Sequence, residues 1–126
     1  MSALVLIIED NPRNLKLARD ILNHAGYETL EALNAEDGLA LARARHPGVV
    51  LMDVHLPGMD GVQALSRLRS DPVTRDIPVV AVTAFAMRDD RRRLLAAGFD
   101  DYVEKPLDIR DFPRQVAAAL AGGGAN

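Results

Sequence analysis

Five polar residues spread along the 126-residue chain each lie where a short apolar run ends, namely Glu9, Asp10, Asp53, Thr83 and Lys105. If these runs are parallel strands, the five side chains emerge together at one edge of a sheet. In open α/β sheets, ligands bind in the crevice outside the carboxyl ends of the strands. Carboxylates, a hydroxyl donor and a mobile positive charge are the groups that phosphoryl transfer uses, so this spacing predicts a phosphoryl-transfer site.

The three carboxylates of this set repel one another, which favours either a bound cation or a raised pKa on one member. Mg²⁺ suits such a site because it takes hard oxygen ligands, keeps several waters and binds phosphoryl oxygens as well. Glu9 and Asp10 would supply much of the negative charge. Asp53 is the best candidate for a nucleophile because it ends a fully apolar run and is followed by a loop, and Lys105 and Mg²⁺ would offset the transferred charge.

Apolar runs alternate with helical patterns five times, which predicts an α/β fold with a parallel sheet. The runs at residues 4–8, 49–52 and 79–82 lack polar alternation, so we expect helices on both of their faces. Residues 27–32 and 101–104 alternate in polarity, as edge strands do.

Helix signals fill the gaps between the runs. Asn11, Asn34 and Asp60 can cap three helices, and Gly26 and Gly98 can end two. The predicted helices cover about residues 12–25, 35–46, 61–70, 88–97 and 108–121.

Bulk composition places the chain among small single domains. We expect one domain over residues 1–121 and a flexible, glycine-rich tail over residues 122–126. Fifteen basic and eighteen acidic residues give a formal charge of −3, which argues against direct nucleic-acid binding. Cysteine is absent, and no apolar run has transmembrane length, so we expect a cytoplasmic protein without membrane insertion.

Four segments together resemble the receiver domain of two-component response regulators, the CheY-like family. They are Glu9-Asp10-Asn11, the stretch 52–61, Thr83-Ala84 and Lys105-Pro106, in the usual order and at the usual spacing. Residues 79–87 look particularly like single-domain receivers of the DivK type. The resemblance implies a single (βα)5 doubly wound domain, with a five-stranded parallel sheet in the order 2-1-3-4-5 and helices on both faces.

The resemblance also implies roles for the acidic residues. Asp53 would accept a phosphoryl group from a phosphohistidine on a histidine kinase or a histidine phosphotransfer protein. Asp10, Asp53 and the backbone carbonyl of His55 would bind Mg²⁺ directly, and Glu9 would act through water. Such a protein catalyses only its own phosphorylation and dephosphorylation, so the resemblance does not imply an enzyme.

The resemblance also implies which groups would contact the phosphoryl group and respond to it. The Thr83 hydroxyl, the Ala84 backbone N–H and Lys105 would contact the phosphoryl oxygens. Tyr102 would turn inward when Thr83 moves, and would change the surface of the fourth helix, fifth strand and fifth helix that meets a downstream protein target. The family also implies a cis peptide bond between Lys105 and Pro106.

From sequence alone, four features each have more than one interpretation. Tyr102 can also be a static, half-buried edge tyrosine. His55 either tunes the lifetime of the phosphate, with Phe85 shielding the site from water, or has no role. The run Arg91-Arg92-Arg93 is either a solvated helix face or a dock for an acidic partner. Thr83 can also be a simple helix cap.

Two other kinds of protein fit part of the pattern. One is a Mg²⁺-dependent phosphatase resembling the haloacid dehalogenase family, which also uses an aspartate nucleophile. Its usual second aspartate, two residues after the nucleophile, is replaced here by His55. The other is a receiver domain excised from a hybrid histidine kinase, which the glycine-rich tail allows.

Overall fold

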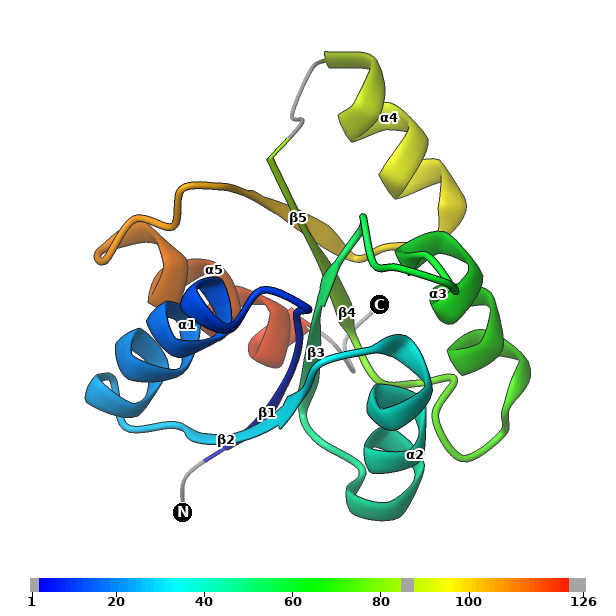
Figure 1. The fold of residues 1–126 in the computed structure, drawn as a ribbon, viewed down its shortest axis with the longest axis horizontal. Coiled ribbons are helices and arrows are strands. Elements are labelled where there is room, and N and C mark those ends of the chain that lie inside the picture. Colours follow the sequence, from blue (N-terminus) through cyan, green and yellow to red (C-terminus); the bar gives the residue numbers. More distant parts are fainter. Residues whose placement is uncertain (1–2, 85–87, 123–126) are drawn as a thin grey trace.

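The computed structural model describes residues 3–84 and 88–122, in which five strands alternate with five helices (Figure 1). Phe85 lies outside these described residues. The strands are β1 (Leu4–Ile8), β2 (Glu28–Ala32), β3 (Val49–Asp53), β4 (Val79–Thr83) and β5 (Asp101–Glu104). The helices are α1 (Pro12–His24), α2 (Ala35–Arg45), α3 (Gly61–Ser70), α4 (Arg88–Ala97) and α5 (Asp111–Gly122). None of the helices in the described part of the chain is long and apolar enough to cross a membrane.

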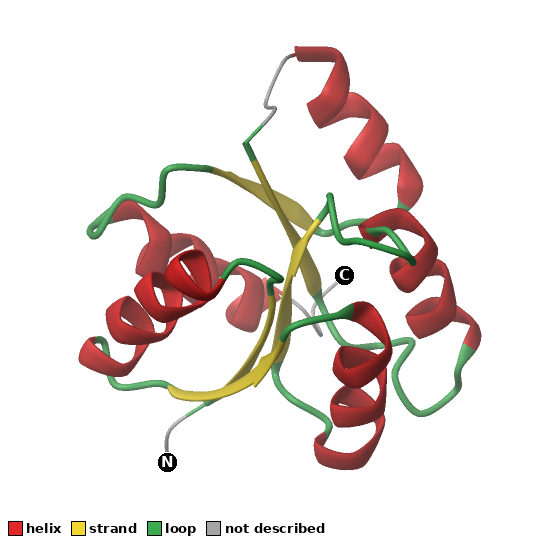
Figure 2. Cartoon of the chain, in the orientation of Figure 1, coloured by secondary structure: helices red, strands yellow, loops and turns green. Residues whose placement is uncertain are grey.

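The five strands form one parallel sheet in the order β2-β1-β3-β4-β5, as expected. Helices α1 and α5 cover one face, and α2, α3 and α4 lie on the other (Figures 1 and 2). The alternating segments β2 and β5 are the edge strands, and the three apolar strands lie between them. Because all five strands run in the same direction, the residues that follow them gather at one edge.

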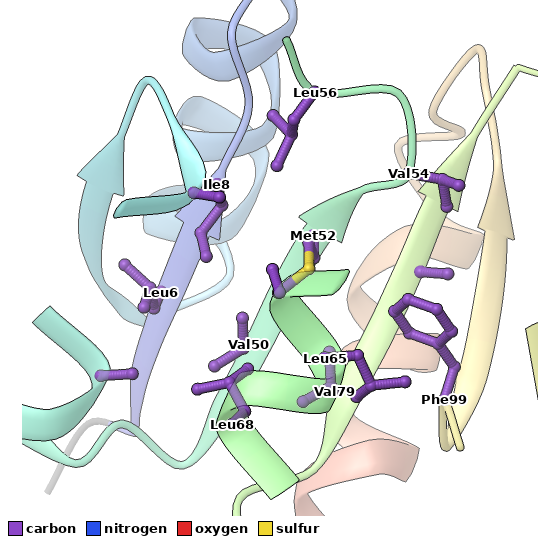
Figure 3. Packing of buried hydrophobic residues seen from close by; sticks show 14 of the residues in the cluster. Leu6, Ile8, Val50, Met52, Val54, Leu56, Leu65, Leu68, Val79 and Phe99 are labelled. Atoms are coloured by element: carbon purple, nitrogen blue, oxygen red, sulfur yellow. The ribbon is translucent and has the colours of Figure 1, made fainter. Parts of the chain in front are cut away.

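Two apolar layers hold the helices to the sheet. On one side, Leu65 and Leu68 of α3 pack against Val50 and Met52 of β3 (Figure 3). On the other side, fully buried Phe112 of α5 joins a second cluster with α1. Each such buried side chain contributes about 1.5–3 kcal/mol of transfer free energy. The central strands are therefore apolar on both faces because helices cover both.

The helix ends follow local chemistry. The Asn11 side chain accepts the Arg13 N–H at 2.9 Å, which caps α1. Asp60 and Gln63 form a capping box at the start of α3. Gly98, with φ of 113°, adopts the left-handed conformation that ends α4. These sequence signals for helix boundaries are confirmed.

Helix α5 begins later than the sequence pattern predicts, at Asp111 instead of near Asp108. The Asp108 side chain accepts the backbone N–H groups of Arg110 and Asp111, at 2.8 and 2.9 Å. Asp108 therefore caps a turn that precedes the helix, and the prediction was wrong by three residues because the cap was counted as helix.

The amino edge of the sheet is fastened by Arg69 at the end of α3. Its guanidinium donates to the carbonyl of Ile77 at 2.6 Å, to that of Gly98 at 3.3 Å and to Asp100 Oδ2 at 2.8 Å. The same Asp100 oxygen accepts the Val79 N–H at 2.7 Å. One side chain thus ties α3 to the starts of β4 and β5.

Candidate functional site at the carboxyl edge of the sheet

The backbone ladder continues past the strand ends and carries the polar residues with it. The Glu9 N–H donates to the Ala32 carbonyl at 3.0 Å, and the Lys105 N–H donates to the Thr83 carbonyl at 2.8 Å. Asp53 closes β3 and still pairs with Val82 of β4. The side chains are therefore positioned by regular strand geometry.

Lys105 joins two buried carboxylates. Its Nζ lies 2.6 Å from Glu9 Oε1 and 3.2 Å from Asp53 Oδ2. The side chains of Lys105, Glu9 and Asp53 are only 18%, 6% and 8% exposed. Backbone groups hold the other oxygens, because the Asn11 N–H donates to Glu9 Oε2 at 3.2 Å and the His55 N–H donates to Asp53 Oδ1 at 3.0 Å. Both carboxylates are thus fixed in orientation.

Asp10 completes an acidic cluster with these two carboxylates. One oxygen each from Glu9, Asp10 and Asp53 lies within 4.8 Å of the others. Glu9 and Asp53 are buried, whereas Asp10 is exposed to solvent. Oxygen donors of this kind suit Mg²⁺, which binds one or two carboxylates and keeps water in its remaining positions. The donor set therefore fits a hard divalent cation.

Burial and coupling set the protonation of the cluster. Burial, and after it the hydrogen bond with Asp53, raise the pKa of Glu9 from 4.5 to about 7, although the hydrogen bonds from Lys105 and the Asn11 N–H act to lower it. Burial also acts to raise the pKa of Asp53, but the hydrogen bonds from Glu9 and from the His55 N–H, with the charge of Lys105, bring it below its usual value. Without a cation, Asp53 is therefore ionised at neutral pH, whereas Glu9 is protonated in a fraction of the molecules.

Lys105 stays charged in this setting. Burial acts to lower its pKa, but the hydrogen bond to Glu9 and the charge of Asp53 outweigh burial, so that the pKa rises above its ordinary value. The site thus combines one fixed positive charge with an excess of carboxylates.

The remaining predicted residues surround this cluster. Thr83 is buried at the end of β4, and exposed Ala84 follows it. His55 is exposed beside Asp53. Tyr102 is half-buried on β5, where it pairs with Ala81. The Lys105–Pro106 bond is cis, as the family resemblance implied.

The role of Gly61 was not predicted from sequence. A Cβ at this position would lie 2.8 Å from Val54 Cα and 2.9 Å from the Asp53 carbonyl oxygen. The Gly61 N–H also donates to the Val54 carbonyl at 3.0 Å. Helix α3 can therefore start directly against the backbone that carries Asp53. The signal was a glycine right after the capping residue Asp60.

The sequence also gave no sign of a cavity beside the acidic cluster. It has a volume of about 70 Å³ and reaches from the cluster between α1 and the segment that precedes α5. Its mainly apolar wall includes Leu17, Ala18, Leu107 and Phe112, and its polar end is formed by Glu9, Asp53 and Lys105.

Comparison with known proteins adds an independent observation. The family described as "Response regulator receiver domain" matches residues 5–117. The polar-differentiation response regulator DivK of Brucella ovis is 40% identical over 120 residues, which cover 95% of this chain and 98% of DivK. The DivK protein of Brucella anthropi has the same identity and coverage.

Solved structures give the same picture. A CheY-like response regulator receiver domain protein from Methanospirillum hungatei is 28% identical with a TM-score of 0.87, covering 98% of this chain and 97% of that one. The receiver domain of a sensor histidine kinase from Pseudomonas aeruginosa is 29% identical with a TM-score of 0.88, covering 96% and 99%. That structure has a magnesium ion coordinated in its active site cleft. Separate regulators and receivers within kinases are thus both among the similar proteins.

Proposed function

Because this chain belongs to the response regulator receiver family of two-component signalling, we propose that it accepts a phosphoryl group on Asp53 and signals through protein contacts. The observation that carries the proposal is the half-buried Lys105 ammonium between the buried carboxylates of Glu9 and Asp53, with Asp10 completing an acidic cluster. A carboxylate nucleophile, a fixed positive charge and a cation site are the parts that phosphoryl transfer to an aspartate needs.

Asp53 is prepared for attack on phosphorus. The His55 N–H and Lys105 hold its two oxygens, and its lowered pKa keeps it ionised. One oxygen forms a bond to phosphorus while the bond between phosphorus and the donor histidine nitrogen breaks, and the protonated imidazole leaves as neutral histidine. The product is an aspartyl phosphate, which is a covalent intermediate that a carboxylate can form.

Lys105 then supports the transferred group. Its ammonium already contacts Asp53, so a small movement brings it to a phosphoryl oxygen without loss of its charge. Glu9 holds the ammonium from the other side at 2.6 Å. Lys105 thus lowers the energy of the transition state by charge compensation at a buried site.

The acidic cluster is the proposed holder of Mg²⁺. Glu9, Asp10 and Asp53, with the backbone carbonyl of His55, would hold the ion. When bound, Mg²⁺ offsets the negative charge of the carboxylates and of the transferring phosphoryl group.

Thr83, Ala84 and Tyr102 form the proposed readout. The Thr83 hydroxyl and the Ala84 N–H would donate to phosphoryl oxygens, and Tyr102 would follow the movement of Thr83. One hydrogen bond to a charged group is worth about 1.5–3 kcal/mol, whereas a shift from 1:99 to 99:1 needs about 5.5 kcal/mol. Thr83 alone is therefore insufficient, and we expect partial activation until a partner binds.

The partners follow from this chemistry. A histidine kinase or a histidine phosphotransfer protein would supply the phosphoryl group, and a downstream protein would bind the surface of α4, β5 and α5. We expect this exchange in the cytoplasm, without direct contact to nucleic acid.

A phosphorylation assay tests the proposal. Incubation with Mg²⁺ and a small phosphodonor should give an acid-stable, base-labile adduct on Asp53, located by mass spectrometry. Asp60→Asn is the matched control, since it changes an exposed carboxylate that caps α3, and it should still be labelled. Equal labelling of Asp53→Asn would refute the proposal, and multiple turnover of a phosphomonoester would favour the phosphatase alternative.

A further inference from the structure

Helix α4 and strand β5 are joined by a contact between a cation and an aromatic ring. The guanidinium carbon of Arg91 lies 5.2 Å from the centroid of the Tyr102 ring. This separation falls within the distance at which a guanidinium is attracted to the face of a tyrosine. Tyr102 is half-buried and packs against the apolar cluster that holds α3 to the sheet.

Few of the described side chains of α4 are buried. Of the α4 side chains that the structure describes, at residues 91–97, Leu94 alone is buried. Arg91 precedes Leu94 by three residues, so both lie on the same face of the helix. The end of α4 is held separately, because Arg69 donates to the Gly98 carbonyl and Phe99 is buried. Arg91 therefore provides a contact between α4 and β5 about one helical turn before Leu94, away from that anchor.

We infer that Arg91 is a latch that holds the Tyr102 ring in its resting orientation against α4. This inference rests on the proposed function, in which Tyr102 moves when Asp53 is phosphorylated. Any rotation of the ring away from the guanidinium gives up their attraction. The latch therefore biases the unphosphorylated protein toward the resting state, and its removal shifts the ring before any phosphate arrives.

The expected size of this bias is modest. Arg91 is exposed, and cation–π contacts at exposed sites are weak. Converted to an equilibrium, their usual strength corresponds to a change of about two- to fivefold in the ratio of the two ring orientations. An effect of this size tunes a switch without locking it, so phosphorylation can still overcome it.

Neighbouring arginines provide the matched control. Arg92 is also exposed and follows Arg91 directly, so it points to a different side of the helix. Arg91→Gln and Arg92→Gln therefore remove the same charge from the same segment, but Arg91→Gln alone removes the contact with Tyr102. Arg91→Lys keeps the charge and should restore part of the effect.

Fluorine NMR of protein labelled with 3-fluorotyrosine measures the ring directly. The chain has two tyrosines, so Tyr27 serves as an internal reference and Tyr27→Phe assigns the Tyr102 signal. Beryllofluoride, a mimic of a phosphoryl group, defines the activated signal. In the unphosphorylated protein, Arg91→Gln should shift the Tyr102 signal toward its activated position, by an amount that corresponds to a two- to fivefold change in the ratio of the two ring orientations. Arg92→Gln should leave the signal unchanged.

The outcomes separate the latch from the proposed function. Identical Tyr102 signals in Arg91→Gln and Arg92→Gln, with unchanged thermal unfolding, would overturn the latch even if Asp53 accepts phosphate normally. A shift in Arg91→Gln alone would support the latch. Failure of Asp53 to accept phosphate, measured on the same samples, would instead overturn the proposed function while the Arg91 effect on the ring stands.

Discussion

Lys105 and Arg69 lie at opposite edges of the same sheet, and each collects partners from distant parts of the chain. Lys105 faces two carboxylates, Glu9 and Asp53, with Asp10 beside them. Arg69 faces one carboxylate, Asp100, and otherwise donates to backbone carbonyls. Those carbonyls belong to Arg75, Ile77 and Gly98.

The difference between the two networks is charge balance. At the amino edge, one cation meets one anion and neutral acceptors, so the network is complete as it stands. At the carboxyl edge, the carboxylates outnumber the cation, and the pKa of Glu9 rises as a result of burial and of its neighbour Asp53. The excess of carboxylates at the carboxyl edge favours binding of a further cation or a transferred group. The balanced charges at the amino edge stabilise the fold.

The sharpest test of this contrast is Lys105→Met. Removal of one preorganised hydrogen-bond donor from a transition state typically costs about 10²–10³-fold in rate, so we expect phosphorylation of Asp53 to slow by at least about a hundredfold. Phosphorylation should be followed by mass spectrometry at fixed phosphodonor concentration. Arg69→Ala is the control, and it should be phosphorylated at nearly the normal rate at a temperature where it is folded. A comparable slowing in both variants would contradict the division between the edges.

Charge excess also predicts a carboxyl group that titrates near neutrality. In the metal-free protein, NMR of the Glu9 side chain should give a pKa of about 7. Asp53→Asn should lower this pKa toward the ordinary value of 4.5, because it removes the partner that raises it after burial. If the pKa of Glu9 is the same in the Asp53→Asn variant, burial alone raises it.

The titration of Glu9 makes the free energy of unfolding depend on pH in a defined direction. The folded protein binds the Glu9 proton more tightly than the unfolded chain does, so the stabilisation from Glu9 is complete below pH 4.5. It declines as the pH rises from 4.5 through about 7. Denaturant unfolding across this range should show the decline, and Glu9→Gln should flatten it.

At the opposite edge, Arg69→Ala should lower the free energy of unfolding by about 2 kcal/mol, since the partly buried Ile77 carbonyl loses a charged donor. Chemical denaturation measures this change. Arg67→Ala, on an exposed position of the same helix, should change stability by less than about 0.5 kcal/mol. Equal effects of the two substitutions would mean that the network at Arg69 contributes little.

A smaller effect than that of Arg69→Ala is expected at an exposed ion pair near the same edge. Arg43 of α2 pairs with Asp71 after α3, and the Arg43 side chain is 62% exposed. Arg43→Ala should cost at most about 1 kcal/mol, because water screens exposed pairs. A loss as large as that of Arg69→Ala would show that the ion pairs, and not the carbonyl contacts, stabilise this edge.

Much of the fold was predictable because local patterns encode it. The apolar runs identified all five strands, and β3 and β4 extend one residue further than expected because Asp53 and Thr83 remain in the ladder. The gathering of Glu9, Asp10, Asp53 and Lys105 followed from parallel strand direction alone. The roles assigned to Thr83, Ala84 and Tyr102 stay predictions.

The contacts between distant side chains could not be predicted. Arg69 and Asp100, for example, lie 31 positions apart. Several other acidic residues were equally available to Arg69, and only the packed fold decides which pair meets. The pairing of Arg91 with Tyr102 is of the same kind.

The low burial of residues 91–97 favours local opening of α4. Because Leu94 is the sole buried side chain among residues 91–97, detachment of the helix exposes little apolar surface. Such local opening needs less free energy than global unfolding, so backbone amides of α4 should exchange hydrogen sooner than those of α3. A partner that prefers the detached helix would then select a minor state that the resting protein already samples.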